Sequence, residues 1–270
     1  MNKLIITVAP TGNVPTKELN PNSPLKTDEI VKDIEKCVNA GAAVAHIHVR
    51  DENLQPTSDR NIYKKVVEEI DKRKINVIKQ LSTGARGGEN SFEWRGQMLD
   101  LNAHMASLST GSSNFAKSIN ANSFELIEAL AGKMYENNIK PEIEVFDLAM
   151  LSNAVFLQKK GVLKGPLQFN LVMNVPGSIK GTPKNLMFLV DQLPEKSTWT
   201  VSGIGNSQIQ MITMAIALGG NVRTGLEDVI YYEKDVLATN EMLVKRVVNI
   251  AEAVGRKIAT VEEAKEILSI

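Results

Sequence analysis

Two of the three histidines in this 270-residue chain stand two positions apart, His46 and His48, inside the apolar segment 44–49. The segment predicts a buried β-strand, in which residues i and i+2 point to the same face about 7 Å apart. Two neutral imidazoles are costly to bury unpaired, and a divalent metal relieves that cost because it takes both nitrogens. Hydrogen bonds to the backbone or to carboxylates could also satisfy both rings. The pair alone leaves both interpretations open, and a metal site needs a third ligand from elsewhere.

A carboxylate for such a site stands near the end of the chain, after the predicted strand 221–224. Glu227 or Asp228 would complete a set of two histidines and one carboxylate with an open position, which is typical of catalytic metal sites. Acidic residues here could instead mark a helix N-terminus, where they favour the macrodipole. Arg223 favours the metal interpretation, because it precedes Glu227 by four residues and a buried arginine needs an acidic partner.

Small and hydroxyl-bearing residues follow two further predicted strands. Ser82 and Gly84 begin the loop 82–88, whose glycines would let the backbone approach a ligand closely, although a flexible turn has the same composition. Ser107 and Ser109 share one face of the predicted strand 105–109 and could hold a carboxylate or carbonyl group. Serine is also common at strand ends, so this pattern predicts a substrate contact only weakly.

Two glutamates, Glu142 and Glu144, share one face of the predicted strand 142–145. If both point inward, their carboxylates need cationic partners. The candidates are Arg223, Arg50 and Lys79.

The elements that must position these residues alternate along the whole chain. Short apolar runs predict strands at 4–9, 44–49, 77–81, 105–109, 142–145, 167–172, 198–203 and 221–224. Amphipathic patterns predict helices near 27–40, 59–73, 92–100, 123–138, 147–160, 183–193, 206–219 and 240–254. Eight strands alternating with eight helices predict a single (β/α)8 TIM-barrel domain over residues 1–270, with its active site at the carboxyl ends of the strands. A doubly wound open sheet is the second choice, and the absence of a G-x-G-x-x-G turn after the first strand argues against it.

The composition narrows the classes of function. Lysine plus arginine and aspartate plus glutamate number 31 each, which argues against nucleic-acid binding. The single Cys37 excludes an internal disulfide and is compatible with a reducing compartment. We find neither a signal peptide nor a run of about 20 apolar residues, so we expect a cytoplasmic protein with no membrane partner.

Seven segments together resemble the β-keto acid cleavage enzymes, and the resemblance runs the whole length of the chain. They are 8–12, 46–51, 82–84, 105–108, 141–146, 175–177 and 223–228. The resemblance implies a zinc-dependent TIM barrel that condenses a β-keto acid with acetyl-CoA to give acetoacetate and a new acyl-CoA. It also implies an oligomer, usually a homotetramer.

The resemblance assigns roles to individual residues. It implies that His46, His48 and Glu227 hold zinc, which acts as a Lewis acid on the oxygens of the keto acid. It maps a group for proton abstraction onto Arg223, Asp228 and Ser82. We expect the substrate to lie among the remaining candidates, which are Thr11, Val14, Gly84, Ser107, Ser109, Glu142 and Glu144. Ser107 replaces the threonine of the family prototype and keeps its hydroxyl group.

Two departures from the prototype bear on the substrate. The prototype cleaves 3-keto-5-aminohexanoate in lysine fermentation and holds the amino group with a glutamate, where this chain has Val14. Val229 stands where the prototype has an asparagine. An apolar site would leave an ammonium group unpaired. We therefore predict a β-keto acid with a neutral or apolar tail, with the amino substrate as the alternative.

Two other classes of function compete with this interpretation. Metal-dependent hydrolases on the same barrel also begin with a His-x-His strand, but they usually recruit further histidines. His104 is the only one left, and it precedes a predicted strand, at the wrong end of the barrel. A barrel without catalysis, which binds a metabolite or serves a structural role, would purify without metal.

Overall fold

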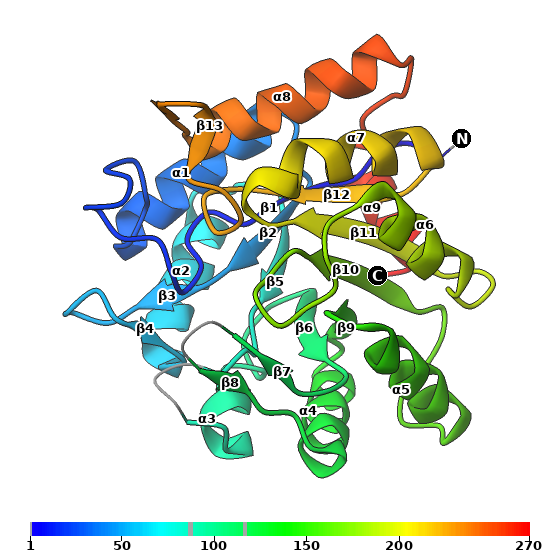
Figure 1. The fold of residues 1–270 in the computed structure, drawn as a ribbon. Helices are drawn as coiled ribbons and strands as arrows, with labels where there is room; N and C mark the ends of the chain where they lie inside the picture. The colour runs from blue at the N-terminus through cyan, green and yellow to red at the C-terminus, as the bar shows by residue number, and fades with distance from the viewer. Residues whose placement is uncertain (1, 86–88, 116–117) are drawn as a thin grey trace.

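The computed structural model describes residues 2–85, 89–115 and 118–270. Among them, eight parallel strands close into a barrel in the order β1-β12-β11-β10-β9-β6-β5-β2 (Figure 1). Their bounds are β1 Ile6–Val8, β2 Val44–Ile47, β5 Ile78–Leu81, β6 Met105–Ser109, β9 Lys140–Val145, β10 Gln168–Met173, β11 Thr198–Gly203 and β12 Asn221–Thr224. The closed barrel confirms the predicted (β/α)8 fold and excludes the doubly wound open sheet.

Helices alternate with these strands and cover the outside of the barrel (Figure 1). They are α1 Thr27–Asn39, α2 Arg60–Lys72, α3 Phe92–Gly96, α4 Phe124–Glu136, α5 Leu148–Lys159, α6 Pro183–Asp191, α7 Gln208–Leu218 and α8 Asn240–Ala253, followed by α9 Val261–Leu268. Side-chain caps fix several starting points. For example, Thr239 Oγ1 accepts the N–H of Met242 at the start of α8. Among the described residues, no helix is both long and apolar enough to span a membrane.

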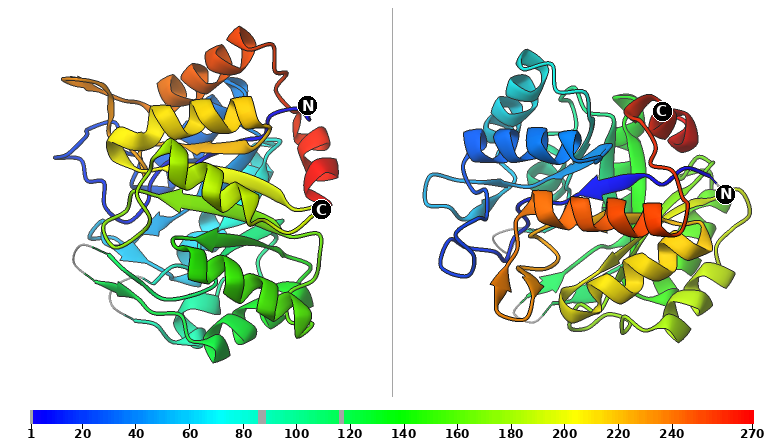
Figure 2. Two further views of the ribbon diagram at one scale, coloured as in Figure 1. Left: turned by 45° about the vertical axis from the view of Figure 1, so that its right-hand side comes forward. Right: turned by 90° about the horizontal axis from the view of Figure 1, so that it is seen from above.

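The two ends of the barrel carry different structures. We call the end where the strands finish the mouth, and the opposite end the base. Figure 2 shows both termini on the base side, and the long loop after β1 on the mouth side. Three antiparallel hairpins extend the loops that follow the barrel strands: β3 Val49–Arg50 with β4 Pro56–Thr57, β7 Ser113–Asn114 with β8 Ile119–Asn120, and β13 Tyr231–Glu233 with β14 Val236–Leu237. The mouth is therefore where loops from distant parts of the sequence meet.

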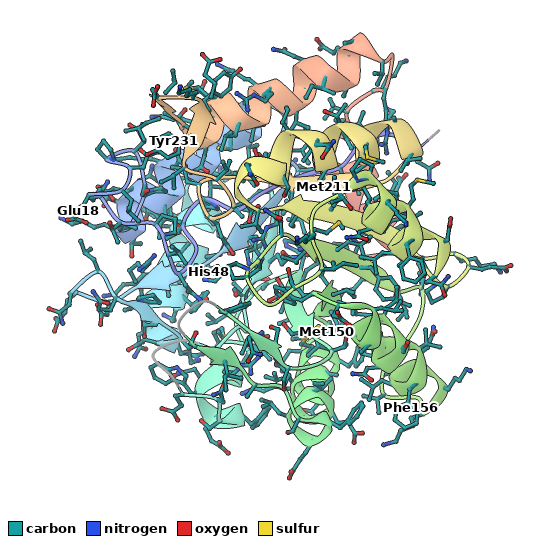
Figure 3. All side chains as sticks on the ribbon, in the orientation of Figure 1. Glu18, His48, Met150, Phe156, Met211 and Tyr231 are labelled. Atoms are coloured by element: carbon teal, nitrogen blue, oxygen red, sulfur yellow. The ribbon has the colours of Figure 1, made fainter. Side chains whose placement is uncertain are left out.

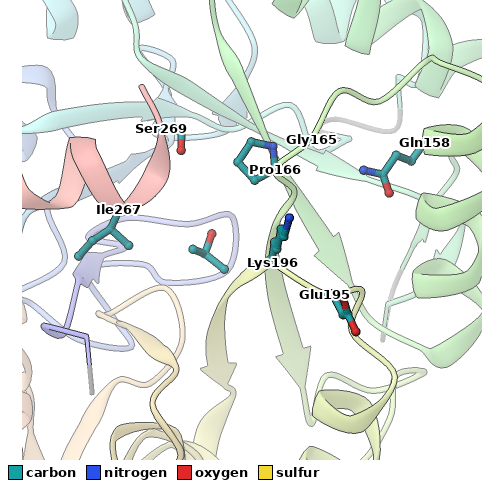
Figure 4. Close-up of a pocket in the computed structure, with 8 residues that line it drawn as sticks. Gln158, Gly165, Pro166, Glu195, Lys196, Ile267 and Ser269 are labelled. Atoms are coloured by element: carbon teal, nitrogen blue, oxygen red, sulfur yellow. The ribbon is translucent and has the colours of Figure 1, made fainter.

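The base of the barrel is closed by an apolar cluster. Ile5, just before β1, and Val44, Ile78 and Met105 from the neighbouring strands pack with residues of α9. Those residues are Val261, Ala264 and Leu268, which recur at helical spacing and form the buried face of α9. A shallow groove beside this helix, lined by Pro166, Lys196 and Ile267 among others, also lies at the base (Figure 4). It is far along the strands from the predicted site residues.

The upper interior of the same barrel is polar. The register pairs His46 with Gln80 and Ser107 with Glu142, so these side chains stand level on adjacent strands. All four residues are buried. Because side chains alternate along a strand, the residues between them face the helices outside and build the main apolar core.

Candidate active site

The two histidines at the end of β2 turn the same nitrogen toward each other. Their Nε2 atoms are 3.2 Å apart, and both residues are buried. Each Nδ1 faces an amide oxygen: His46 faces Gln80 Oε1 at 2.7 Å and His48 faces Asn13 Oδ1 at 2.9 Å. An amide oxygen only accepts, so each Nδ1 carries the proton and each Nε2 presents a lone pair. Two lone pairs that converge in this way need a shared cation between them.

Glu227 completes the group from the loop after β12. Its Oε1 lies 3.4 Å from His48 Nε2 and 3.9 Å from His46 Nε2, and one ligand atom from each residue lies within 4.8 Å of the others. Ligands about 2.0–2.1 Å from a tetrahedral metal are about 3.3 Å apart, which is close to these separations. Glu227 Oε2 is buried without a hydrogen-bond partner. The three residues therefore fit a divalent metal, and sequence reasoning had selected all three.

Electrostatics keep these ligands in the forms that bind a metal. Burial, reinforced by Arg223, lowers the pKa of His46 well below its usual value, so the ring is neutral. Burial opposes ionisation of Glu227, but Arg223 and the two histidines outweigh it and hold the pKa of this carboxyl well below its usual value. A neutral imidazole and an ionised carboxylate are the ligand forms that a divalent cation requires.

Close backbone approaches bring Glu227 to the histidines. The N–H of Glu227 donates to Ala9 O at 3.1 Å, so the loops after β1 and β12 lie against each other. Gly225 has a φ of 152°, and a Cβ there would lie 2.1 Å from Ala9 O. A Cβ on Gly12, whose φ is 63°, would lie 2.4 Å from Glu227 Cγ. Glycine is required at both positions for the two loops to meet.

Arg223 organises the carboxylates beside the metal group. Its Nε and Nη2 donate to Asp228 at 3.1 and 2.7 Å, and Nη2 also donates to Glu227 Oε1 at 2.8 Å. Its Nη1 lies 3.8 Å from Glu144 Oε1. This bidentate geometry fixes the Asp228 carboxylate rigidly. Burial nevertheless raises the pKa of Asp228, because it outweighs the attraction of Arg223.

The two strand glutamates both point inward, as predicted, and Arg223, one of the three predicted partners, lies beside Glu144. Glu144 faces Arg223, and Ser109 Oγ donates to it at 3.1 Å. Glu142 lies deeper and accepts from Gln168 Nε2 at 3.4 Å. Burial raises the pKa of both, that of Glu144 to about 7.

The prediction that Lys79 pairs with these glutamates was wrong. Lys79 Nζ donates to Asp71 on α2 at 2.6 Å, because residue 79 alternates with the inward Gln80 and faces outside. Arg50 donates instead to Gly12 O, Pro15 O and Leu54 O, and so braces the loop after β1.

The hydroxyl groups at the mouth are partly engaged with the protein itself. Thr11 Oγ1 donates to Pro24 O within the loop after β1, at 3.0 Å. Ser107 Oγ accepts from Thr83 N at 3.2 Å. Ser82 follows β5, and its N–H donates to Ile47 O between the two histidines, at 3.1 Å. Its neighbour Gly84 N lies 3.5 Å from Ser82 Oγ. Residues 86–88 of the predicted glycine loop lie outside the described part of the chain.

Two predicted positions and one dismissed histidine complete the survey. Val14 is 75 % exposed and follows Asn13, the residue that orients His48 (Figure 3 labels His48 beside this loop). Val229 is half-buried against Leu226, Ala238 and Leu243. His104 accepts Lys79 N through Nδ1 outside the site, as expected of a structural histidine.

Sequence reasoning missed the residues that support the site. Asn13 and Gln80 orient the histidines, and Arg95 ties Thr83 O to Ala121 O beneath the loop after β5. Gln80 could have been found from the sequence, because it lies near the end of the predicted strand 77–81, as His46 does in the predicted strand 44–49. Asn13 and Arg95 carry no signal of this kind, because their roles depend on how the loops fold.

A family model described as beta-keto acid cleavage enzyme matches residues 3–270 of this chain. The chain belongs to this family. Two curated members are each called 3-keto-5-aminohexanoate cleavage enzyme. The one from Acetoanaerobium sticklandii is 43 % identical and the one from Fusobacterium nucleatum 41 %, and each match covers 100 % of this chain and 99 % of the relative. A third, the 3-oxoadipate:acetyl-CoA acetyltransferase of Cupriavidus necator, is 39 % identical over 98 % of this chain and 94 % of its own.

Solved structures support the fold of this beta-keto acid cleavage enzyme family member. The apo structure of ObcA superposes with a TM-score of 0.78 at 20 % identity, and the match covers 92 % of this chain and 66 % of that longer one. The type I 3-dehydroquinate dehydratase of Clostridium difficile superposes with a TM-score of 0.60 at 9 % identity, over 94 % of this chain and 93 % of its own. At such identities the likeness extends to the barrel alone.

Proposed function

We propose that this family member transfers the acyl group of a β-keto acid to coenzyme A, with acetyl-CoA as cosubstrate and zinc held by His46, His48 and Glu227. The observation that carries the proposal is the convergence of these three side chains around the unpartnered Glu227 Oε2. In the overall reaction the C2–C3 bond of the keto acid and the C–S bond of acetyl-CoA break. C2 joins the acetyl carbonyl carbon, and the sulfur of coenzyme A joins C3. The products are acetoacetate and the new acyl-CoA, so atoms and electrons balance without an added oxidant or reductant.

The metal, when bound, supplies a Lewis acid that polarises the oxygens of the keto acid and makes the protons on C2 more acidic. Asp228 accepts a C2 proton, and its position supports this role because Arg223 holds both of its oxygens. The raised pKa of Asp228 brings its basicity closer to what proton transfer at neutral pH requires. Ser82, whose N–H donates to Ile47 O between the two histidines, completes the proposed group for proton abstraction with Arg223 and Asp228.

The tail of the substrate is proposed to be neutral or apolar. Val14 supports this, because its loop also carries the Asn13 that bonds His48 and so lies at the rim of the metal group. Neither Val14 nor the half-buried Val229 can pair with an ammonium group. The specific alternative is 3-keto-5-aminohexanoate, which is favoured by the 41–43 % identity to relatives with that name.

A substrate panel tests the proposal. Purified enzyme receives acetyl-CoA and one of three β-keto acids of similar length: 3-oxohexanoate, 3-keto-5-aminohexanoate or 3-oxoadipate. We expect stoichiometric acetoacetate and acyl-CoA, with kcat/KM highest for the neutral acid. Preferred turnover of 3-keto-5-aminohexanoate would overturn the proposed neutral tail but would leave the proposed reaction standing. Turnover that does not depend on acetyl-CoA would instead indicate a hydrolase.

A matched pair of variants tests the role of Val14 directly. Val14→Glu should raise kcat/KM for the amino substrate relative to the neutral one, because it adds a carboxylate at the rim. Val14→Gln introduces a side chain of the same size as glutamate but without the charge. It should leave the ratio of kcat/KM for the amino substrate to kcat/KM for the neutral substrate near that of the wild type. Equal ratios in both variants would remove Val14 from substrate selection.

We also propose a homotetramer, which large apolar side chains on the outer helices support. Phe156 on α5, Phe188 on α6, and Ile209 and Leu218 on α7 are each 41–51 % exposed. Light scattering coupled to size-exclusion chromatography measures the mass directly. A mass near 29.6 kDa, that of one chain, would contradict this proposal.

A further inference from the structure

Asn240, the first residue of α8, is fully buried and connects three separate segments. Its Oδ1 accepts the N–H of Leu226 in the loop after β12, at 2.7 Å. Its Nδ2 donates to Pro10 O in the loop after β1, at 3.1 Å, and to Asp33 Oδ2 on α1, at 2.5 Å. One side-chain amide therefore joins the loop that carries Glu227 and the loop after β1 that packs against it to a helix on the outside of the barrel.

The orientation of this amide is determined by its partners. If the amide were turned over, its NH2 group would face the N–H of Leu226, and its oxygen would face two acceptors, Pro10 O and the Asp33 carboxylate. Asp33 lies on α1 and contributes no atom to the metal group, yet it fixes which way the amide points. Burial raises the pKa of Asp33 to about 6, against the opposing effect of its hydrogen bond to Asn240.

The two loop residues that Asn240 binds are adjacent in the chain to the two residues whose hydrogen bond places Glu227. Leu226 precedes Glu227, and Pro10 follows Ala9, whose carbonyl accepts the N–H of Glu227 at 3.1 Å. The peptide on each side of this loop-to-loop contact is thus bonded to the same amide. A shift of either loop would move the Glu227 carboxylate relative to the two histidines, whose positions are set by β2.

The beginning of α8 does not need this side chain for its cap. Thr239 is the N-cap residue, and its Oγ1 accepts the N–H of Met242 at 3.2 Å. The three hydrogen bonds of Asn240 are all made to other segments. A role limited to starting the helix therefore does not account for a fully buried amide with every polar atom used.

We propose that Asn240 is a positioning residue for the metal group, oriented by Asp33, and that it holds the Glu227 carboxylate at bonding distance from the cation shared with His46 and His48. The inference rests on the proposed function, because it presupposes that these residues bind a metal. It adds two residues that do not themselves contact the metal, and assigns them an effect on metal affinity. Supporting residues of this kind typically change affinity 10–100-fold when they are altered.

The test compares Asn240→Leu with Thr239→Ala in the full-length chain. Leucine is similar in size to asparagine, and Asn240→Leu removes all three hydrogen bonds. Thr239→Ala removes the side-chain cap of the same helix and leaves the bonds of Asn240 to the two loops in place. The zinc dissociation constant is measured by competition with a chelating dye. We expect Asn240→Leu to raise it 10–100-fold and Thr239→Ala to leave it within about threefold of the wild type. Urea unfolding confirms that both variants are folded.

A second measurement separates positioning from general damage. Activity of Asn240→Leu should fall at limiting zinc and recover with excess zinc, while Thr239→Ala should show the wild-type zinc dependence. The absorption of the Co²⁺-loaded protein should also change in Asn240→Leu, because one ligand moves. If Asn240→Leu does not fold, Asp33→Leu keeps Asn240 and removes only its orienting partner, and we expect a rise of about tenfold in the dissociation constant.

The outcomes distinguish the two proposals. If the wild type binds zinc and neither Asn240→Leu nor Asp33→Leu differs from Thr239→Ala, the positioning role is overturned and the proposed function stands. If the wild type binds no divalent metal, the metal site on which the proposed function rests is wrong, and this inference fails with it.

Discussion

The mouth and the base of this barrel are built from the same strands but have opposite interiors. On β5, Ile78 packs with α9 at the base, and Gln80, two residues later, bonds His46. On β6, Met105 belongs to the base, while Ser109 bonds Glu144 near the mouth. Two residues along a strand advance only about 6.6 Å, and four advance about 13 Å. A short distance along one strand thus separates apolar packing that stabilises the fold from buried polar site residues that reduce its stability.

The energetics of the two ends differ accordingly. At the base, apolar surface is removed from water at roughly 25 cal/mol per Å². At the mouth, Arg223 and three carboxylates are buried together, and the cost of desolvating them offsets much of their mutual attraction. We therefore expect changes at the mouth to affect activity first, and changes at the base to affect the free energy of unfolding alone.

The largest effect is expected from the double variant His46→Ala/His48→Ala. Loss of the Lewis acid removes several kcal/mol of transition-state stabilisation, so kcat/KM should fall ~10³-fold or more. Metal analysis should show one equivalent per chain in the wild type and none in the variant, with an unchanged circular dichroism spectrum. His104→Ala is the matched control and should keep its metal. An active double variant would contradict the metal assignment.

Two buried arginines offer the second test of the comparison. Arg223→Met leaves buried carboxylates uncompensated at the mouth and should cost about 3–5 kcal/mol of unfolding free energy, together with activity. Arg256 donates to backbone carbonyls of Asn2, Ile216, Gly219 and Gly220 instead. Arg256→Met should also destabilise the fold but leave kcat/KM of the folded protein unchanged. Urea unfolding and steady-state assays at 25 °C measure both. Equal losses of kcat/KM in Arg223→Met and Arg256→Met would contradict a specific role of the mouth arginine in activity.

At the base, Leu268→Ala isolates packing. Leu268 is 2 % exposed within the cluster that α9 forms under the strands. Its truncation should cost about 2–5 kcal/mol of unfolding free energy, because it removes buried apolar contacts and leaves a cavity. The kcat/KM of the folded variant should match the wild type. A specific loss of zinc or activity would mean that the base communicates with the mouth.

Much of this division could be predicted from the sequence. The strands at 105–109, 198–203 and 221–224 match the structure at both ends, and the first and last of these are buried along their whole length. The strand expected at 4–9 is shorter, since Leu4 makes only an isolated bridge with Ile258. The rule that sites lie at strand ends led from the histidine pair to Glu227 or Asp228. The family resemblance selected Glu227, which the structure places with the histidines.

What sequence could not supply is the direction of side chains in loops and the placement of the last helix. Asn13 and Asn240 are ordinary polar residues until the loops fold, because their partners are far away in the chain. The closure of the base by α9 is a tertiary contact that the amphipathic pattern of residues 261–268 does not specify. The mistaken role of Lys79 has a different origin, because this residue lies on β5 and faces away from the inward Gln80.

The smallest effect, and the sharpest measure of what the polar mouth costs, is the pH dependence set by Glu144. Burial raises its pKa from 4.5 to about 7, against the attraction of Arg223. The folded state therefore binds a proton more tightly than the unfolded state. The stability that this proton contributes is complete below about pH 4.5 and is lost as pH rises to about 7. A shift of this size corresponds to at most about 3 kcal/mol.

Glu144→Gln removes this titration and can still accept the hydrogen bond of Ser109 Oγ. The difference in unfolding free energy, wild type minus variant, should be constant below pH 4.5 and fall by about 2–3 kcal/mol by pH 8. Urea titrations at steps of half a pH unit measure it, and the subtraction cancels Asp33, whose pKa burial raises to about 6. Parallel curves for the two proteins would show that the pKa of Glu144 is the same in the folded and unfolded states. In that case the attraction of Arg223 would offset the burial of this carboxylate, and burying Glu144 at the mouth would cost no stability at neutral pH.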